Sequence, residues 1–314
     1  MKKKKVSSQI KDILWATDFS EESFVCLPYI RFISEKLKTN NHGLYVLPRF
    51  SDWVYETAFI KDDELLKTIE KTKVESLKRI ETVGKIANIH ITPGALEGIA
   101  SEELIRYAEN NEIDIILAGR KGESEIEDIL VGSTTSRLIR NSSIPVFVIP
   151  ELKSGEDAAE PVREDEYAVP KKDVKVERIL SPIDLGESTL LELKYSISLA
   201  KQLGAKLYVV HVAEFFNYKV PMFKRDALIT KISKKITGIA EESEFEIEDI
   251  IYETGEPAHK IIETAKQNNI DLVVMATHQR KGFEKFFLGS ISEKVLMYSN
   301  IPVLVLPPSD YELF

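Results

Sequence analysis

Apolar residues occur along the chain in short runs, and longer segments with helical periodicity separate these runs. The runs at 13–18, 44–47 and 113–117 are short and mostly apolar, which is typical of strands that are buried on both faces of a parallel sheet. Between them, residues 62–87 carry apolar side chains at about helical spacing, which predicts an amphipathic helix. Strands that alternate with helices predict a parallel, doubly wound α/β sheet.

The second half of the chain repeats this pattern. The spacing from Gly98 to Asp114 is sixteen residues, and so is the spacing from Gly255 to Asp271. Each half contains the tripeptide Leu-Tyr-Val in its second predicted strand, and each ends in a run that begins Ile-Pro-Val. One repeated spacing and two repeated sequence motifs that agree at once indicate an internal duplication.

The duplication predicts two tandem domains, residues 1–150 and 174–314. Residues 151–173 between them are charged, contain glycine and proline and few apolar residues, and are predicted to form a linker. Short right-handed crossovers predict a five-stranded sheet in each half with the flavodoxin-like order 3-2-1-4-5. The closing Ile-Pro-Val strands would be apolar edge strands, and because such edges invite pairing, we expect them to join the halves as a pseudo-dimer.

Composition and charge narrow the classes of function that are open to this chain. The chain has 314 residues, of which 43% are hydrophobic, so it is long enough for two cores. Its formal charge of 42 − 51 = −9 argues against a general nucleic-acid or anionic-membrane binder. The single cysteine, Cys26, excludes an internal disulfide and a cysteine-based zinc site, and we expect it to pack in the first helix. No signal peptide follows the N-terminal lysines and no apolar run reaches membrane-spanning length, so we expect a cytoplasmic protein.

One stretch of the first half has the character of a nucleotide-phosphate cradle. In the predicted order, strands one and four are neighbours at the switch point, so Asp18 would face Gly119 there. Gly119 and Gly122 allow the backbone to turn tightly and to approach a ligand closely. Gly132 and Ser133 open the next helix, where Ser133 is a good N-cap and the helix start attracts phosphate.

The arrangement Gly119-x-x-Gly122, nine residues, Gly132-Ser133 resembles the nucleotide signature of the universal stress protein family. The aspartate that ends the first strand and the closing Ile-Pro-Val strand resemble that family too, and the resemblance covers both halves. It implies ATP, or the related ADP or AMP, bound with Asp18 near the adenine and ribose. The implied contacts of the first half are Ala16, Asp18, Ala118, Gly119, Gly122, Gly132, Ser133 and Thr134. Those of the second half are Asp184, Val212, Ala276, Gly289 and Ser290.

Each half departs from the family pattern at a different place. In the second half, Ala276 and Gln279 replace the two leading glycines, while His278 and the residues after it resemble the usual loop of the family. In the first half, Pro48 and Arg49 alter the end of the second strand that faces the adenine in the family. The acidic residues after Gly122 would repel a polyphosphate unless Mg²⁺ or the direction of the loop relieves the repulsion; they are Glu123, Glu125, Glu127 and Asp128.

Three classes of function stay open. The first is a stress-response module that binds nucleotide for regulation, in which the halves pair and which is compatible with further assembly into a homo-oligomer. The second is a slow ATPase or a nucleotidyl or phosphoryl transferase, although no catalytic base or metal-ligand pair is evident near Ser133. The third is a scaffold that binds a partner protein and no nucleotide. Asp18 and Asp184 can also simply cap the helices that follow them.

Overall fold

The computed structural model describes residues 4–48, 62–122, 131–151, 162–164, 167–184, 189–213, 222–277, 290–307 and 311–313. Within them, the chain separates into two compact units. One contains residues 11–141 and 151–174, and the other contains residues 1–10, 142–150 and 175–314. The units follow the two sequence repeats except at the N-terminus, at the closing strand of the first half, and in the linker.

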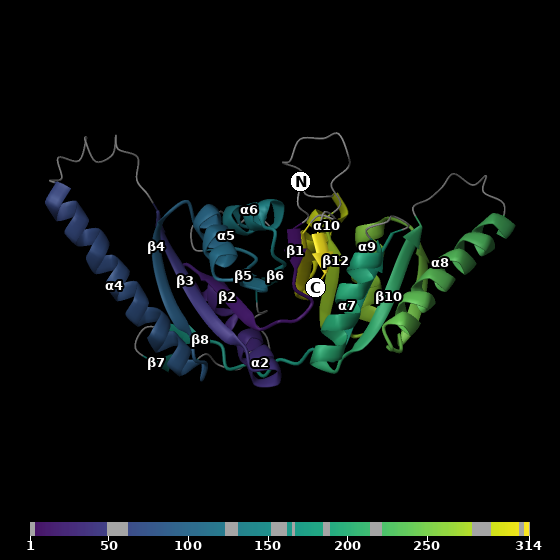
Figure 1. The fold of residues 1–314 in the computed structure, drawn as a ribbon, viewed down its shortest axis with the longest axis horizontal. Helices are drawn as coiled ribbons and strands as arrows, with labels where there is room; N and C mark the ends of the chain where they lie inside the picture. Colours follow the sequence, from purple (N-terminus) through teal and green to yellow (C-terminus); the bar gives the residue numbers. More distant parts are fainter. Residues whose placement is uncertain are drawn as a thin grey trace. The chain divides into compact units, whose positions relative to one another are not determined.

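The first unit is a parallel sheet with helices on both faces (Figure 1). Its strands have the order β4-β3-β2-β5, which is the predicted third-second-first-fourth order. The strands are β2 (Asp12–Thr17), β3 (Asn40–Pro48), β4 (Thr92–Gly98) and β5 (Ile115–Gly119). Helices α1 (Glu21–Phe24), α2 (Leu27–Leu37) and α4 (Asp62–Ile86) contact one face. Helices α5 (Ala100–Asn110) and α6 (Ser133–Asn141) belong to the other.

The first helix of this unit is broken. Ser20 caps α1 by accepting a hydrogen bond from the Ser23 backbone N–H at 3.1 Å, and α1 then ends at Phe24. Pro28 stands in the first turn of α2. Because proline lacks an N–H and clashes with the carbonyl four residues earlier, one continuous helix cannot pass through this position. Cys26 is fully buried at the break, as expected of a packing residue.

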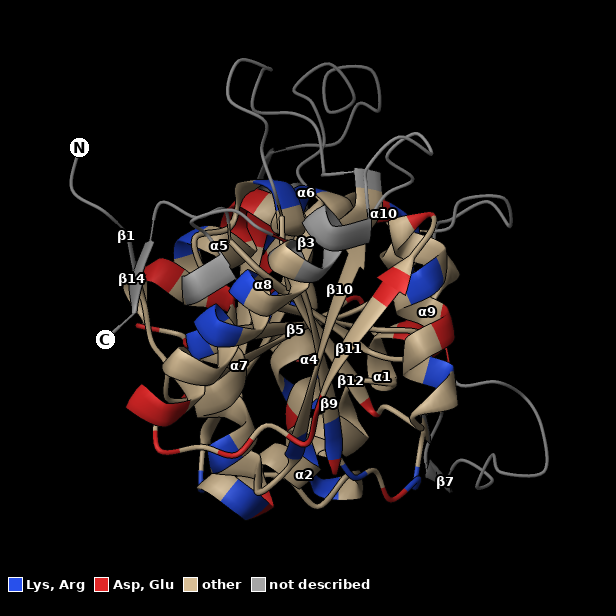
Figure 2. Cartoon of the chain, turned by 90° about the vertical axis from the view of Figure 1, so that its right-hand side faces the viewer, with Lys and Arg blue, Asp and Glu red and all other residues tan. Residues whose placement is uncertain are grey.

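The second unit contains β9 (Arg178–Ile183), β10 (Lys206–Ala213), β11 (Asp249–Thr254), β12 (Leu272–Ala276) and β13 (Val303–Leu306). Their order, β11-β10-β9-β12-β13, confirms the predicted 3-2-1-4-5 arrangement. Helices α7 (Thr189–Leu203) and α8 (Met222–Glu242) pack together, and so do α9 (Pro257–Gln267) and α10 (Ser290–Tyr298). Figure 2 shows that Lys, Arg, Asp and Glu lie mostly on the helices and the loops, around strands that are largely tan.

The closing strand of the first half, β6 (Val146–Ile149), pairs antiparallel with β13, and Phe147 lies opposite Leu304. Every residue of both strands is buried. The expected pairing of the two Ile-Pro-Val strands is therefore confirmed. It explains why β6 groups with the second half, since an apolar edge strand is stabilised when it is paired and covered.

Four short strands were not predicted from the sequence. β1 (Lys4–Val6) pairs in parallel with β14 (Tyr311–Leu313). β7 (Val162–Glu164) and β8 (Tyr167–Val169) pair antiparallel within the linker. The linker therefore contains a hairpin, and this hairpin belongs to the same compact unit as the first half. No helix in the described ranges is both long and apolar enough to span a membrane.

Candidate functional site

The site of the first half lies at the carboxyl ends of β2 and β5. These strands are neighbours in register, with Trp15 opposite Leu117, so Asp18 follows one strand where Gly119 ends the other. A Cβ built on Gly122 would lie 2.6 Å from Asp18 Oδ2. The two motifs, which are about a hundred residues apart in the sequence, therefore meet at one place.

The partner of Asp18 is not the one that we expected. Asp18 faces Gly122, whereas Gly119 is covered by α1, because a Cβ at Gly119 would lie only 2.2 Å from the Glu22 carbonyl oxygen. Both positions lack room for a side chain, but for different reasons. Gly119 is restricted by backbone, which cannot move without shifting α1, and Gly122 by a side chain that can rotate.

The Asp18 carboxylate is held by the turn that follows it. Ser20 donates two hydrogen bonds to Asp18 Oδ1, from its hydroxyl at 2.5 Å and from its backbone N–H at 3.1 Å. The hydroxyl of Thr17 accepts a hydrogen bond from the Phe19 backbone N–H at 3.0 Å. Asp18 nevertheless remains exposed. Ser20, and not Asp18, caps α1, so the simpler interpretation that Asp18 caps this helix is wrong. Asp18 instead accepts hydrogen bonds from the capping residue and still presents its carboxylate at the switch point.

Helix α6 is fastened to the end of β5. Thr135 donates its hydroxyl hydrogen to the Gly119 carbonyl at 2.8 Å, and the Gly132 backbone N–H donates to the Arg120 carbonyl at 2.8 Å. The helix begins at Ser133, and the Gly132 carbonyl accepts its first helical hydrogen bond, so Gly132 rather than Ser133 occupies the N-cap position. The start of α6, where backbone N–H groups favour anions, is thereby fixed beside the Gly119–Gly122 turn.

The remaining predicted contacts of the first half lie close to these. Ala118 is buried in β5, Ala16 is half-buried in β2, and Thr134 is half-buried in the first turn of α6. Lys121 supplies a positive charge and lies 3.6 Å from the carboxylate of Glu151, the first residue of the linker. Arg49 and the four acidic residues after Gly122 lie outside the described residues.

The described residues of the site offer groups that can bind a ligand. Burial, and then the nearby negative charge of Asp18, raise the pKa of the Cys26 thiol, so this cysteine stays protonated and is not a nucleophile. The described part of the chain contains no group of three His, Cys, Asp or Glu side chains that could hold a metal ion. The arrangement can accept hydrogen bonds at Asp18 and can attract an anion at Lys121 and at the start of α6.

The second half keeps the framework of the site. Ser292 donates its hydroxyl hydrogen to the Ala276 carbonyl at 3.1 Å, which repeats the contact between Thr135 and Gly119. Asp184 is exposed at the end of β9, and Val212 is half-buried in β10. Ser290 begins α10, while Gly289, Gln279 and His278 lie outside the described residues.

Other features of the second half differ from the first. His211 is buried, and its Nδ1 donates to the Ile183 carbonyl at 3.0 Å, because a carbonyl oxygen can only accept. Thr277 follows β12 and is buried, and its hydroxyl oxygen finds no hydrogen-bond partner among the described residues. A small apolar hollow beside Asp184 lies between α7 and α8 and is lined in part by Leu193 and Ile236.

Sequence reasoning missed the two hydroxyl contacts, although a signal was present. Thr135 and Ser292 stand at the same position of the repeat, three residues after Gly132 and Gly289. It also missed two aspartates at the same position of the repeat, which accept backbone hydrogen bonds at the start of the first strand of each half. Asp114 accepts hydrogen bonds from the backbone N–H groups of Lys11 and Asp12, and Asp271 accepts them from those of Glu177 and Arg178.

Comparison with known proteins gives a consistent result. The universal stress protein family matches residues 9–150 and 175–307. Universal stress protein MJ0531 of Methanocaldococcus jannaschii is 31% identical over 138 residues, which is 41% of this chain and 81% of the relative. Universal stress protein MJ0577 of the same organism is 26% identical over 167 residues, which is 48% of this chain and 100% of the relative.

A solved structure resembles the whole chain. The crystal structure of a universal stress protein from Archaeoglobus fulgidus covers 96% of this chain, and this chain covers 97% of that one, with a TM-score of 0.66 and 22% sequence identity. At this level of identity, the likeness shows a shared fold.

Proposed function

The chain belongs to the universal stress protein family, and we propose that its first half binds ATP, or the related ADP or AMP, as a regulatory ligand at the carboxyl ends of β2 and β5. Family membership supports a general role in the stress response. The nucleotide site itself is our inference from the geometry of the first half, together with the family signature that this half carries in full.

The juxtaposition of Asp18 and Gly122 supports this proposal most strongly. An exposed carboxylate at a topological switch point can accept hydrogen bonds from ribose hydroxyls or from the adenine amine. On the same edge, the fixed start of α6 provides backbone N–H groups and a dipole that favour phosphate. Lys121 adds a positive charge there. Its ion pair with Glu151 does not prevent it from contacting a ligand instead, because surface ion pairs are weak.

The described residues fit a nucleotide better than a metal-dependent catalyst. Asp18 is hydrogen-bonded to Ser20, and the described part of the chain supplies no three-residue metal cluster beside it. In this proposal, any Mg²⁺ arrives on the phosphates that it neutralises. The bound nucleotide would then act as a signal through occupancy, and turnover would be slow or absent.

The test is isothermal titration calorimetry of the full chain, stripped of nucleotide, with ATP, ADP and AMP in the presence and absence of Mg²⁺. The full chain is used because β6 pairs with β13, so a cut after residue 150 would separate paired strands. We expect saturable binding by wild type and loss of at least about tenfold in affinity in Gly122→Val, since its side chain would displace Asp18.

The matched control is Gly289→Val, which alters the corresponding signature position of the second half. This variant should keep the first-half binding. Failure of the nucleotide-free wild type to bind any of the three nucleotides would refute the proposal and would favour a scaffold for a partner protein.

A further inference from the structure

The described part of the linker is packed against the first half. Strand β8 contacts α1 and α4, and Figure 1 shows β7 and β8 beside the lower end of α4. Val169 of β8 is buried, and Arg31 of α2 donates a hydrogen bond to Asp173 at 2.8 Å. The linker hairpin, which we define as residues 162–164 and 167–169, is thus an integral part of this compact unit.

Tyr167 is the centre of the contact. Its ring lies edge-on to the ring of Phe24, with centroids 6.2 Å apart and an interplanar angle of 81°. Its phenolic oxygen accepts a hydrogen bond from Arg79 Nε at 3.0 Å. The guanidinium carbon of Arg79 lies 5.3 Å from the centroid of the Tyr167 ring and 4.2 Å from that of Phe19, within the range of cation–π attraction to both.

Phe19 connects this contact to the nucleotide site. It stands between Asp18 and Ser20 with φ at 66°, a left-handed conformation that aromatic residues rarely adopt. The ring of Tyr45, with its centroid 4.9 Å away, and the guanidinium of Arg79 lie against it. Because the bonds from Ser20 to Asp18 span Phe19, the backbone at Phe19 determines where the Asp18 carboxylate lies beside Gly122.

We propose that Arg79 and Tyr167 are positioning residues for the first-half site: through Phe19, the linker hairpin holds the Asp18 carboxylate where it can accept hydrogen bonds from a nucleoside. This inference rests on the proposed nucleotide binding. It assigns a role in recognition to residues outside the signature, one of them in the segment that joins the two halves.

The arrangement also has a reciprocal consequence. If the hairpin increases the affinity for nucleotide, then bound nucleotide must stabilise the docked hairpin by the same factor, because the coupling between two binding equilibria is symmetric. Nucleotide binding at the first-half site would therefore be detectable as a more stable contact between the linker hairpin and the first half.

The test compares nucleotide affinity in full-length variants by calorimetry with ATP and Mg²⁺. Tyr167→Ala should bind about fivefold more weakly or worse, since it removes both the ring and the acceptor for Arg79. Tyr167→Phe keeps the ring and should lose about twofold to threefold. Arg79→Lys keeps the charge but not the planar donor, and it serves as the second variant if Tyr167→Ala fails to fold. Asp173→Asn is the matched control, because it removes the negative charge from a linker ion pair that does not involve Phe19, and its affinity should be unchanged.

A second readout separates positioning from mere stabilisation. Hydrogen exchange of residues 162–169 should slow when ATP binds to wild type, and this slowing should disappear in Tyr167→Ala. If wild type binds ATP but both Tyr167→Ala and Arg79→Lys bind equally well, the inference is overturned while the nucleotide proposal stands. An equal loss in Asp173→Asn would also overturn it, since the effect would then not pass through Phe19. Absence of binding in wild type would instead remove the nucleotide proposal, and this inference with it.

Discussion

The two halves of the chain have the same framework but differ around the switch point. Both fasten the end of the fourth strand with a hydroxyl group, Thr135 in the first half and Ser292 in the second. The first half then places Gly119 under α1 and Gly122 against Asp18, whereas the second half has Ala276 at the first of these positions. Duplication has thus kept the hydrogen bonds that hold the end of the fourth strand, and the residues around that end have diverged.

A second difference concerns the face between the first helices and the long helix. In the first half, Tyr167 of the linker hairpin packs there against Phe24 and Arg79. In the second half, the corresponding region between α7 and α8 is the small hollow lined by aliphatic side chains and by Asp184 and Lys235. Arg79 and Lys235 both stand nine residues before a left-handed residue, Asn88 and Glu244, that follows the helix. At the same position of the repeat, Arg79 therefore contacts the linker in the first half, and Lys235 lines the hollow in the second.

The largest expected effect comes from exchanging the residues that end the fourth strands. Gly119→Ala would place a Cβ 2.2 Å from the Glu22 carbonyl oxygen, so α1 would have to move away from β5. We expect the free energy of unfolding of the first half to fall by about 2–3 kcal/mol. Both tryptophans, Trp15 and Trp53, lie in this half, so urea denaturation followed by tryptophan fluorescence measures the change.

The control for this exchange is Ala276→Gly. It removes one buried methyl group in the second half and should lower the free energy of unfolding of that half by only about 1 kcal/mol. The urea midpoint of the first half, which tryptophan fluorescence follows, should not change. A wild-type midpoint for Gly119→Ala would contradict the close approach of α1 that distinguishes the two halves.

The hydroxyl contacts should respond alike in both halves. Thr135→Val and Ser292→Ala each remove the donor to a buried strand carbonyl, and we expect each to cost about 1–2 kcal/mol in its own half. Thermal unfolding followed by circular dichroism measures both losses. Thr135→Ser retains the hydroxyl and should stay closer to wild type. If only one of the two variants lost stability, the two hydroxyl contacts would not contribute equally to their halves.

The helices after the third strands offer a gain of stability. Glu256 caps α9 by accepting a hydrogen bond from the His259 backbone N–H at 2.7 Å, whereas Ile99, at the same position before α5, makes no side-chain cap and is 49% exposed. Ile99→Asp should therefore stabilise the first half by about 0.5–1 kcal/mol. Urea midpoints measure the gain, and Ile99→Ala, which removes the apolar side chain without adding an acceptor, should not reproduce it.

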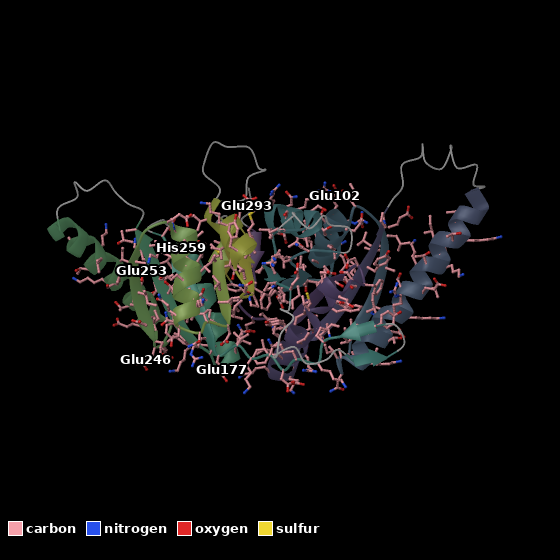
Figure 3. All side chains as sticks on the ribbon, turned by 180° about the vertical axis from the view of Figure 1, so that it is seen from behind. Glu102, Glu177, Glu246, Glu253, His259 and Glu293 are labelled. Atoms are coloured by element: carbon pink, nitrogen blue, oxygen red, sulfur yellow. The ribbon has the colours of Figure 1, made fainter. Side chains whose placement is uncertain are left out.

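The smallest effect is a dependence on pH that belongs to the second half. The hydrogen bond from Lys294, and then that from the His259 N–H, lower the pKa of Glu256 below its ordinary value of 4.5. A carboxylate with a lowered pKa in the folded state stabilises the fold above about pH 4.5, and this contribution is lost as the pH falls through the folded value. Figure 3 labels His259 and Glu253 in this region of β11 and α9, where Lys260 lies between Glu253 and Glu263.

We therefore expect the difference in stability between wild type and Glu256→Gln to be small at pH 7 and to vanish near pH 3. It should also shrink at high salt, because this ion pair is largely exposed. Urea titrations at several pH values measure it. A difference that grows as the pH falls would contradict the sign of the shift.

Much of the fold could be predicted from the sequence because it depends on local patterns. Apolar runs specified the strands, the repeated spacing from Gly98 to Asp114 specified the duplication, and the alternation of strands and helices specified the parallel sheet. The pairing of β6 with β13 was also predictable, since two apolar closing strands without a second neighbour need a partner. The meeting of Asp18 with the glycine loop followed from strand order alone.

The tertiary structure decided what depends on contacts between segments that are distant in the sequence. Pro28 gave a local reason for a break in the first helix, but the closure of α1 over Gly119 and the turn of Asp18 toward Gly122 depend on how the helix packs against the sheet. The hairpin in the charged linker has little apolar pattern of its own, and it lies where Tyr167 contacts Phe24 and Arg79. The sequence by itself thus determined the family, the order of the strands and the residues of the signature, because these depend on local periodicity and spacing. The orientation of those residues, and the packing of the linker against the first half, required the fold, because both depend on contacts that only it brings together.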